Sequence, residues 1–198
     1  MISKYITMTI VYIHGATASG ASFNYLREHV PAHAELVLEY DSENGFFKNL
    51  ETMYNTLMST KGKLFFIGHS LGGIYCLSLA NYFPAKVLGG VTISTPYGGS
   101  EIASFAKYFA PFSILLKEIT PYSKPIAHVK QIAVPKNWTN IVTTKGNSPW
   151  IPGSNDGVVT VDSQRYHTNM NLIDLHTNHY EVLMHLETIK IINEKIPT

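Results

Sequence analysis

Residues 63–80 read KLFFIGHSLGGIYCLSLA, and their hydrophobic pattern changes halfway along the segment. The apolar run from Leu64 to Ile67 has the length and the aromatic and β-branched content of a buried strand, and it stops at Gly68. After the glycine pair that follows, the spacing of the apolar residues suits a helix that packs against a sheet. The sequence therefore predicts a strand, a sharp turn and a helix that meet at Ser70.

The turn itself, residues 68–72, reads GHSLG and fits the pattern G-x-S-x-G. Glycine is needed two residues before and after the serine because side chains there would collide in so tight a turn. Such a turn lifts the oxygen of Ser70 off the sheet and places it near the N–H of Leu71 and the positive end of a helix. An ordinary glycine-rich turn is the alternative, but the strand before it and the helix after it favour a nucleophile.

The composition limits the class of protein. The chain has 198 residues, of which 45% are hydrophobic, which is enough for one domain with a full core. Fifteen Lys and Arg residues against fourteen Asp and Glu residues give a net charge of +1, and nucleic acid is not an expected partner. One cysteine excludes an internal disulfide framework. Because no signal-peptide pattern precedes His14 and no apolar run reaches about 18 residues, we expect a cytoplasmic protein without a transmembrane segment.

Strand-like runs and helical patterns alternate along the chain, which is typical of a mostly parallel sheet with helices on both faces. We therefore expect a three-layer α/β fold in a single domain that spans residues 1–198. The predicted strands are 9–13, 35–40, 64–67, 87–93, 138–144 and 169–175, and the predicted helices are 22–29, 46–57, a helix from residue 74, and 180–195.

The form GHSLGG at the turn resembles the α/β-hydrolase superfamily, in particular its small bacterial lipases and carboxylesterases. The segment HGATASGASFNYL, which begins at His14, is similar to their oxyanion loop and the helix start after it, with residues 17–19 added. The resemblance implies a serine hydrolase that cleaves carboxylic esters through an acyl-enzyme. It also implies an oxyanion hole made by the backbone N–H groups of Ala16 and Leu71, with Thr17 as an alternative to Ala16.

A serine nucleophile needs a base that takes its proton and an acid that holds the base in the right tautomer. In the family that the chain resembles, these residues follow in the order serine, acid, histidine. Asp156, in the sequence NDGVV after the predicted strand 138–144, is the candidate acid. His179, just after the last predicted strand, is the candidate base. The remaining candidates are Asp162 and Asp174 for the acid, His185 as the alternative base, and His176.

Residues 101–130 interrupt the alternation before the penultimate strand. Apolar residues that include Phe105 and Phe109 recur at three- and four-residue steps, and prolines divide the segment. In the family that the chain resembles, an insertion here commonly forms a lid or an acyl-binding wall; the alternative is a helix pair that covers the sheet. Peripheral membrane contact through an exposed apolar face also stays open. The candidates for a substrate pocket are Phe105 and Phe109, Thr17 in the oxyanion loop, and Tyr97.

Tyr97 lies in the segment STPYGGS at 94–100, which is similar to the TPHRGS segment of many bacterial lipases; a plain Pro/Gly turn is the alternative. No cofactor is needed for the implied reaction, and the nine histidines show no metal-ligand spacing such as H-E-x-x-H. The expected substrate is a small-molecule or lipid ester. An acyltransferase or thioesterase would use the same residues, and a non-catalytic binding module is a third alternative, against which the three filled triad positions argue.

Overall fold

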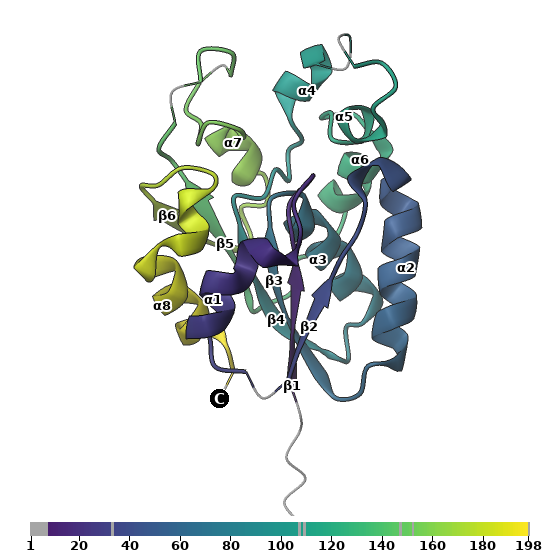
Figure 1. Cartoon of the computed structure of the whole chain (residues 1–198), viewed down its shortest axis with the longest axis vertical. Coiled ribbons are helices and arrows are strands. Elements are labelled where there is room, and N and C mark those ends of the chain that lie inside the picture. The colour runs from purple at the N-terminus through teal and green to yellow at the C-terminus, as the bar shows by residue number, and fades with distance from the viewer. Residues whose placement is uncertain are drawn as a thin grey trace, which may run out of the picture.

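A parallel sheet forms the centre of the molecule (Figure 1). The structure is a computed structural model that describes residues 8–32, 34–106, 108, 110–146, 148–151 and 153–197. Among these residues, six strands lie in the order β2-β1-β3-β4-β5-β6, and every neighbouring pair is parallel. The strands are β1 (Met8–Ile13), β2 (Ala34–Leu38), β3 (Lys63–His69), β4 (Val87–Ile93), β5 (Trp138–Thr143) and β6 (Asn171–Leu175).

Helices connect the strands. The α-helices are α1 (Asn24–His29), α2 (Phe46–Ser59), α3 (Leu71–Tyr82), α4 (Glu101–Ala106), α5 (Ile114–Glu118), α6 (Lys124–Lys130), α7 (Val161–Gln164) and α8 (Leu186–Lys195). The described part of the chain also forms three short 3-10 helices, η1 (Gly20–Phe23), η2 (Ser42–Asn44) and η3 (Glu181–Met184).

The two faces of the sheet carry separate hydrophobic clusters because successive side chains of a strand point to opposite faces. In β1, Val11 and Ile13 pack with residues of α2, α3 and α6, whereas Ile10 and Tyr12 pack with residues of α1 and α8. Figure 1 shows α1 and α8 on one side of the sheet and α2 on the other. The predicted α/β architecture with helices on both faces is therefore confirmed.

The strand predictions are confirmed with small shifts at the ends, but one helical prediction is wrong in detail. The predicted closing helix 180–195 is two elements, because His185 has an extended backbone (ψ 130°) that ends η3 and begins α8. Among the described residues, the predicted helical insertion before β5 contains the three short helices α4, α5 and α6. In the described part of the chain, no helix is both long enough and apolar enough to cross a membrane.

Candidate active site

Ser70 lies at the junction of β3 and α3, as the sequence predicts. Its backbone has φ 53° and ψ −124°, a conformation that non-glycine residues rarely adopt. A Cβ atom on Gly68 would lie 2.6 Å from Sγ of Cys76, and one on Gly72 would lie 1.9 Å from the carbonyl oxygen of Ile13. Both glycines are thus required by close packing, which is the physical reason for the G-x-S-x-G pattern here.

The loop after β1 touches this turn. A Cβ atom on Gly15 would lie 3.2 Å from Cβ of Ser70, so the two residues are closely packed. The N–H groups of Ala16 and Leu71 have no hydrogen-bond partner among the described residues. The N–H of Thr17, in contrast, donates to Oγ of Ser42 at 2.9 Å. Of the two candidate donors in the loop, Ala16 is therefore the one whose N–H is free to bind an oxyanion.

His14 shapes this loop. Its Nδ1 donates to the carbonyl oxygen of Gly15 at 2.8 Å, and its ring stacks on Tyr40 with 4.4 Å between ring centroids. The Tyr40 hydroxyl donates in turn to the carbonyl oxygen of His14 at 3.0 Å, and Nε2 of His14 lies 3.0 Å from a carboxylate oxygen of Glu39. These contacts fix the backbone that leads to Ala16.

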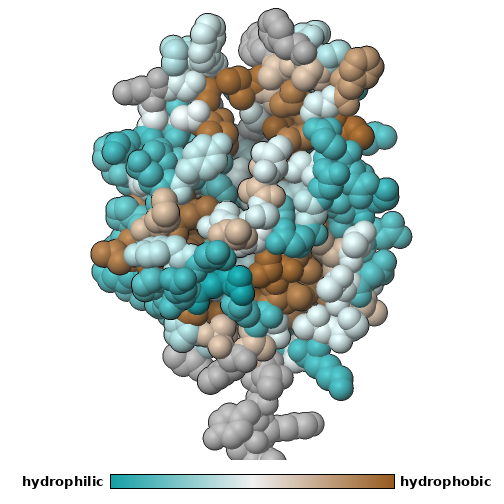
Figure 2. Space-filling view, in the orientation of Figure 1, coloured by the Kyte–Doolittle hydropathy of each residue, from teal (hydrophilic) through white to brown (hydrophobic). Residues whose placement is uncertain are grey.

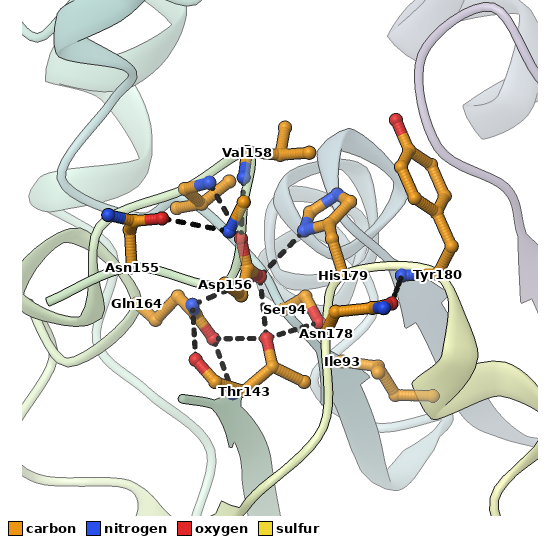
Figure 3. Close-up of polar contacts among 12 residues, drawn as sticks. Ile93, Ser94, Thr143, Asn155, Asp156, Val158, Gln164, Asn178, His179 and Tyr180 are labelled. Carbon is orange, nitrogen blue, oxygen red and sulfur yellow. Dashed lines mark hydrogen bonds and ion pairs between the residues drawn. The ribbon is translucent and has the colours of Figure 1, made fainter. Parts of the chain in front are cut away.

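His179 and Asp156 form a buried pair (Figure 3). Nδ1 of His179 donates to Oδ2 of Asp156 at 2.7 Å, and the backbone N–H of His179 donates to the carbonyl oxygen of Asp156 at 3.1 Å. Asp156 lies in the loop between β5 and α7, and His179 lies between β6 and η3. The structure therefore joins the predicted acid and the predicted base from separate segments.

The Asp156 carboxylate accepts four further hydrogen bonds. Oδ1 accepts from the backbone N–H groups of Val158 at 3.0 Å and Val159 at 2.8 Å, and Oδ2 accepts from Oγ1 of Thr143 at 2.6 Å and Nε2 of Gln164 at 3.3 Å. Burial raises the pKa of this carboxyl, but the hydrogen bonds from His179, Thr143 and Val159 lower it more, so the net pKa lies below the ordinary value. Asp156 is consequently ionised at neutral pH.

His69, the residue before the serine, connects the turn to the loop of the base. Its Nε2 donates to the carbonyl oxygen of His179 at 2.8 Å, and the two rings lie 4.8 Å apart. Burial, with a smaller contribution from the charge of His179, lowers the pKa of His69 to about 3, so its ring is neutral. The Ser70 hydroxyl has no hydrogen-bond partner in the described part of the chain; such contacts often tighten only when substrate binds.

The competing acids and bases lie elsewhere. The exposed His185 caps α8 by accepting the N–H of Glu187 at 3.2 Å, so the alternative base is a helix cap. Asp174 forms an ion pair with Arg165, and Asp162 lies in the first turn of α7. His176 lies with Nδ1 3.4 Å from Oγ1 of Thr144.

The substrate-pocket predictions have different outcomes. The prediction for Tyr97 is wrong, because its fully buried side chain lies in the core, where its hydroxyl bonds with Oγ1 of Thr92 and Nε1 of Trp138. Thr17 is exposed beside the turn. Phe109 and the side chain of Phe105 lie outside what the structure describes.

Two clefts of similar size lie at opposite ends of the strands. One of about 470 Å³ borders the starts of β4 and β5, whereas ligands of open parallel α/β sheets bind at the carboxyl ends of the strands. The other, of about 400 Å³, lies at the carboxyl end and borders Asp156. Its other lining residues are Lys145, Gly146, Gly157, Val158, Asn178 and Tyr180. The described residues contain no group of three or more side chains that could hold a metal ion.

The sequence matches no family model, and no curated protein matches it either. Solved structures do match. A carboxyl esterase from a metagenome has a TM-score of 0.71 at 14% identity, over 96% of this chain and 71% of that chain. A lipolytic enzyme derived from a metagenome (LipS or LipT) has a TM-score of 0.70 at 15% identity, over 94% of this chain and 91% of that chain. The mature lipase BlEst2 of Bacillus licheniformis has a TM-score of 0.66 at 17% identity, with the same two coverages.

The TM-scores establish a common fold at these low identities. The sheet order, the sharp turn between β3 and α3 and these likenesses together show that the chain has the α/β-hydrolase fold.

Proposed function

We propose that the protein is a serine hydrolase that cleaves carboxylic esters. The observation that carries this proposal is the 2.7 Å hydrogen bond between His179 and the buried, ionised Asp156, in a molecule whose Ser70 occupies a strained turn next to His69. Carboxylates are rarely buried unless they are paired, and this one accepts hydrogen bonds from five donors. Buried acids whose pKa is shifted are typical of functional sites.

The reaction would proceed in two halves. Ser70 Oγ attacks the ester carbonyl carbon while Nε2 of His179 takes the serine proton, and Asp156 holds the Nδ1–H tautomer and stabilises the imidazolium. The carbonyl oxygen, now negative, receives hydrogen bonds from the N–H groups of Ala16 and Leu71. The imidazolium then gives its proton to the leaving alcohol, and the acyl group remains on Ser70 until a water activated by His179 releases it as a carboxylic acid. No cofactor takes part in these steps.

Carboxylic esters are proposed as the substrates for two reasons. The resemblance covers the turn, the oxyanion loop and the acid and base segments of lipases and carboxylesterases, and the solved structures with this fold include a carboxyl esterase and a lipase. We therefore propose small-molecule or lipid esters as the substrates. The acyl-chain experiment described below distinguishes an esterase from a lipase.

A fluorophosphonate probe tests the nucleophile directly. We expect one covalent adduct on Ser70 in the folded protein, located by peptide mass spectrometry, and no adduct in Ser70→Ala. The exposed Ser59 at the end of α2 offers a matched control, because Ser59→Ala should label like the wild type. Folded protein that leaves Ser70 unlabelled would instead favour the non-catalytic binding module.

Acyl-chain profiling then defines the reaction. Hydrolysis of p-nitrophenyl esters of increasing chain length separates an esterase, which prefers short chains, from a lipase. An acyl-enzyme that is released faster by an added alcohol, amine or thiol than by water would identify an acyltransferase. Preference for an acyl thioester over the matched oxygen ester would identify a thioesterase.

A further inference from the structure

The buried network under Asp156 contains two side chains that the reaction itself does not use. We propose that Thr143 and Gln164, here called the carboxylate clamp, are positioning residues. They hold the ionised Asp156 against His179 and weaken the attraction between its negative charge and the protonated imidazole. This inference rests on the proposed function, because it assigns these residues a task within the same acid–base pair.

Thr143 contributes the shorter bond of the clamp. It is the last residue of β5 and is fully buried, and its hydroxyl lies 2.6 Å from Oδ2 of Asp156, the same oxygen that accepts from His179. Oγ of the fully buried Ser94 lies 2.8 Å from Oγ1 of Thr143. Because an ionised oxygen is the strongest acceptor present, the Thr143 proton points to Asp156, and the Thr143 oxygen accepts the proton of Ser94. The hydroxyl of Thr143 is thus fixed in its donating orientation.

Gln164 contributes the second bond and ties the clamp to the sheet. Its Oε1 accepts the N–H of Thr143 at 2.9 Å and its Nε2 donates to the carbonyl oxygen of Thr143 at 3.1 Å, as a neighbouring strand would. Nε2 also lies 3.3 Å from Oδ2 of Asp156. The backbone of Gln164 is fixed as well, because Nδ2 of Asn140 donates to its carbonyl oxygen at 2.9 Å. Figure 3 shows Thr143 and Gln164 on the side of Asp156 away from Val158.

The clamp affects the base through competition for one oxygen. Oδ2 of Asp156 shares its negative charge among His179, Thr143 and Gln164, and each donor weakens the attraction available to the others. Loss of the Thr143 hydroxyl would leave more of this charge facing the imidazolium. His179 would then hold its proton to higher pH and would be a working base over a narrower range.

The test compares two changes at Thr143 with a matched change in the same strand. Thr143→Val removes the hydroxyl at nearly constant volume and Thr143→Ser retains it. Thr139→Val removes the hydroxyl of a buried β5 residue whose partner is Asn171 rather than Asp156. The titration of His179 is followed by NMR in the full chain with ¹⁵N-labelled histidine, with its signal assigned by its loss in His179→Gln. The pH profile of kcat/KM is measured in parallel.

We expect the His179 titration midpoint to rise by about half a pH unit or more in Thr143→Val, and the acidic limb of kcat/KM to move with it. Thr143→Ser and Thr139→Val should keep the wild-type midpoint. Gln164→Met should shift the midpoint in the same direction but less, because its bond to Oδ2 is longer. If Thr143→Val does not fold, Thr143→Ala provides the same comparison.

An unchanged His179 midpoint in folded Thr143→Val or Thr143→Ala would overturn the proposal and leave Thr143 with a purely structural role. The NMR titration requires no turnover, so the two proposals fail separately. A shifted midpoint in a protein whose Ser70 is never labelled by the fluorophosphonate would keep the clamp and reject the hydrolase. A labelled Ser70 together with an unshifted His179 midpoint would keep the hydrolase and reject the clamp.

Discussion

Strained residues gather where the strands end. Among the described residues, three non-glycine residues have positive φ, namely Thr17, Ser70 and Ser94, and each follows the carboxyl end of a strand. Such a conformation costs about 1–3 kcal/mol and persists only where the surroundings determine it. Here each of the three backbone N–H groups has an acceptor. That of Thr17 donates to Oγ of Ser42 and that of Ser70 to the carbonyl oxygen of Ile93 at 2.8 Å. That of Ser94 donates to the carbonyl oxygen of Ile141 at 2.9 Å. This edge of the sheet is therefore where the fold fixes unusual backbone geometry.

At the residue scale, Asp156→Asn should affect activity and acid stability in different ways. Its hydrogen-bonded carboxylate has a pKa below the ordinary value of about 4, so it stabilises the fold above that pH and loses this contribution as the pH falls through its folded-state pKa. Urea unfolding should show wild type more stable than Asp156→Asn at pH 7, with the difference shrinking below about pH 4. Activity should fall by about three orders of magnitude or more. A stability difference that stays constant down to acidic pH would contradict this account.

Two carboxylates connect the helical insertion to the segment after β2. One belongs to that segment and accepts hydrogen bonds from the insertion, and the other belongs to the insertion and accepts a hydrogen bond from that segment. Glu43 of η2 accepts the Ser113 hydroxyl and the N–H of Ile114, each at 2.7 Å, at the start of α5. Glu118, at the end of α5, accepts the N–H of Phe46 at 2.7 Å at the start of α2. Each carboxylate thus satisfies an otherwise unpaired donor at a helix N-terminus. This reciprocal contact bears on whether the insertion is a mobile lid or a fixed wall.

At the element scale, Glu43→Ala should loosen α5. We expect faster amide hydrogen exchange over residues 110–123, because the N–H of Ile114 loses its acceptor, with unchanged exchange in β3 and α3. Glu51→Ala, on the exposed face of α2, is the control and should leave the insertion as protected as in the wild type. If the insertion gates the site, Glu43→Ala should also speed the hydrolysis of long-chain esters more than that of acetate esters. Faster exchange with unchanged rates for all chain lengths would identify a fixed wall.

The elements differ in how well their sequences predict them. The strand at 87–93 was predicted with both ends correct, because a buried β-branched run between turn residues has few alternatives. The closing helix was predicted as continuous because Val182, Leu183, Leu186 and Ile189 suit one helical face. Its break at His185 depends on a cap formed by the histidine ring, which hydrophobic spacing does not report.

At the scale of the whole molecule, the order serine, acid and histidine made Ser70, Asp156 and His179 predictable as candidates. The clamp was not predictable, since Gln164 reaches Asp156 only because α7 lies across the end of β5, and nothing in its local sequence distinguishes it from a surface glutamine. The prediction of Tyr97 as a pocket residue is wrong for a related reason. A turn at the end of a strand can point its side chain inward, and the Tyr97 hydroxyl forms hydrogen bonds with polar groups in the core. Local sequence identifies the candidate reacting residues better than it identifies the residues that position them.

Exposed aromatic side chains lie on the segments that leave the carboxyl ends of the strands. Phe112 is 93% exposed and Tyr122 is 97% exposed, both in the insertion, and Trp150 in the loop after β5 is 78% exposed. Figure 2 shows hydrophobic side chains at this end of the molecule. Tryptophan and tyrosine favour a membrane–water interface, so the hypothesis of peripheral membrane contact predicts that this end of the molecule meets the lipid surface.

This surface yields a test that separates a lipase from an esterase. The double variant Phe112→Ser/Tyr122→Ser should bind phosphatidylcholine vesicles less in co-sedimentation and hydrolyse emulsified triglyceride several-fold more slowly, since two exposed rings no longer enter the interface. Its rate on dissolved p-nitrophenyl acetate should be unchanged, because that substrate needs no interface. Met58→Ser/Tyr82→Ser, at the ends of α2 and α3 near the amino ends of the strands, removes exposed apolar surface elsewhere and should match the wild type in both assays. Equal vesicle binding and equal emulsion rates in both double variants would contradict lipid contact and favour an esterase of dissolved substrates.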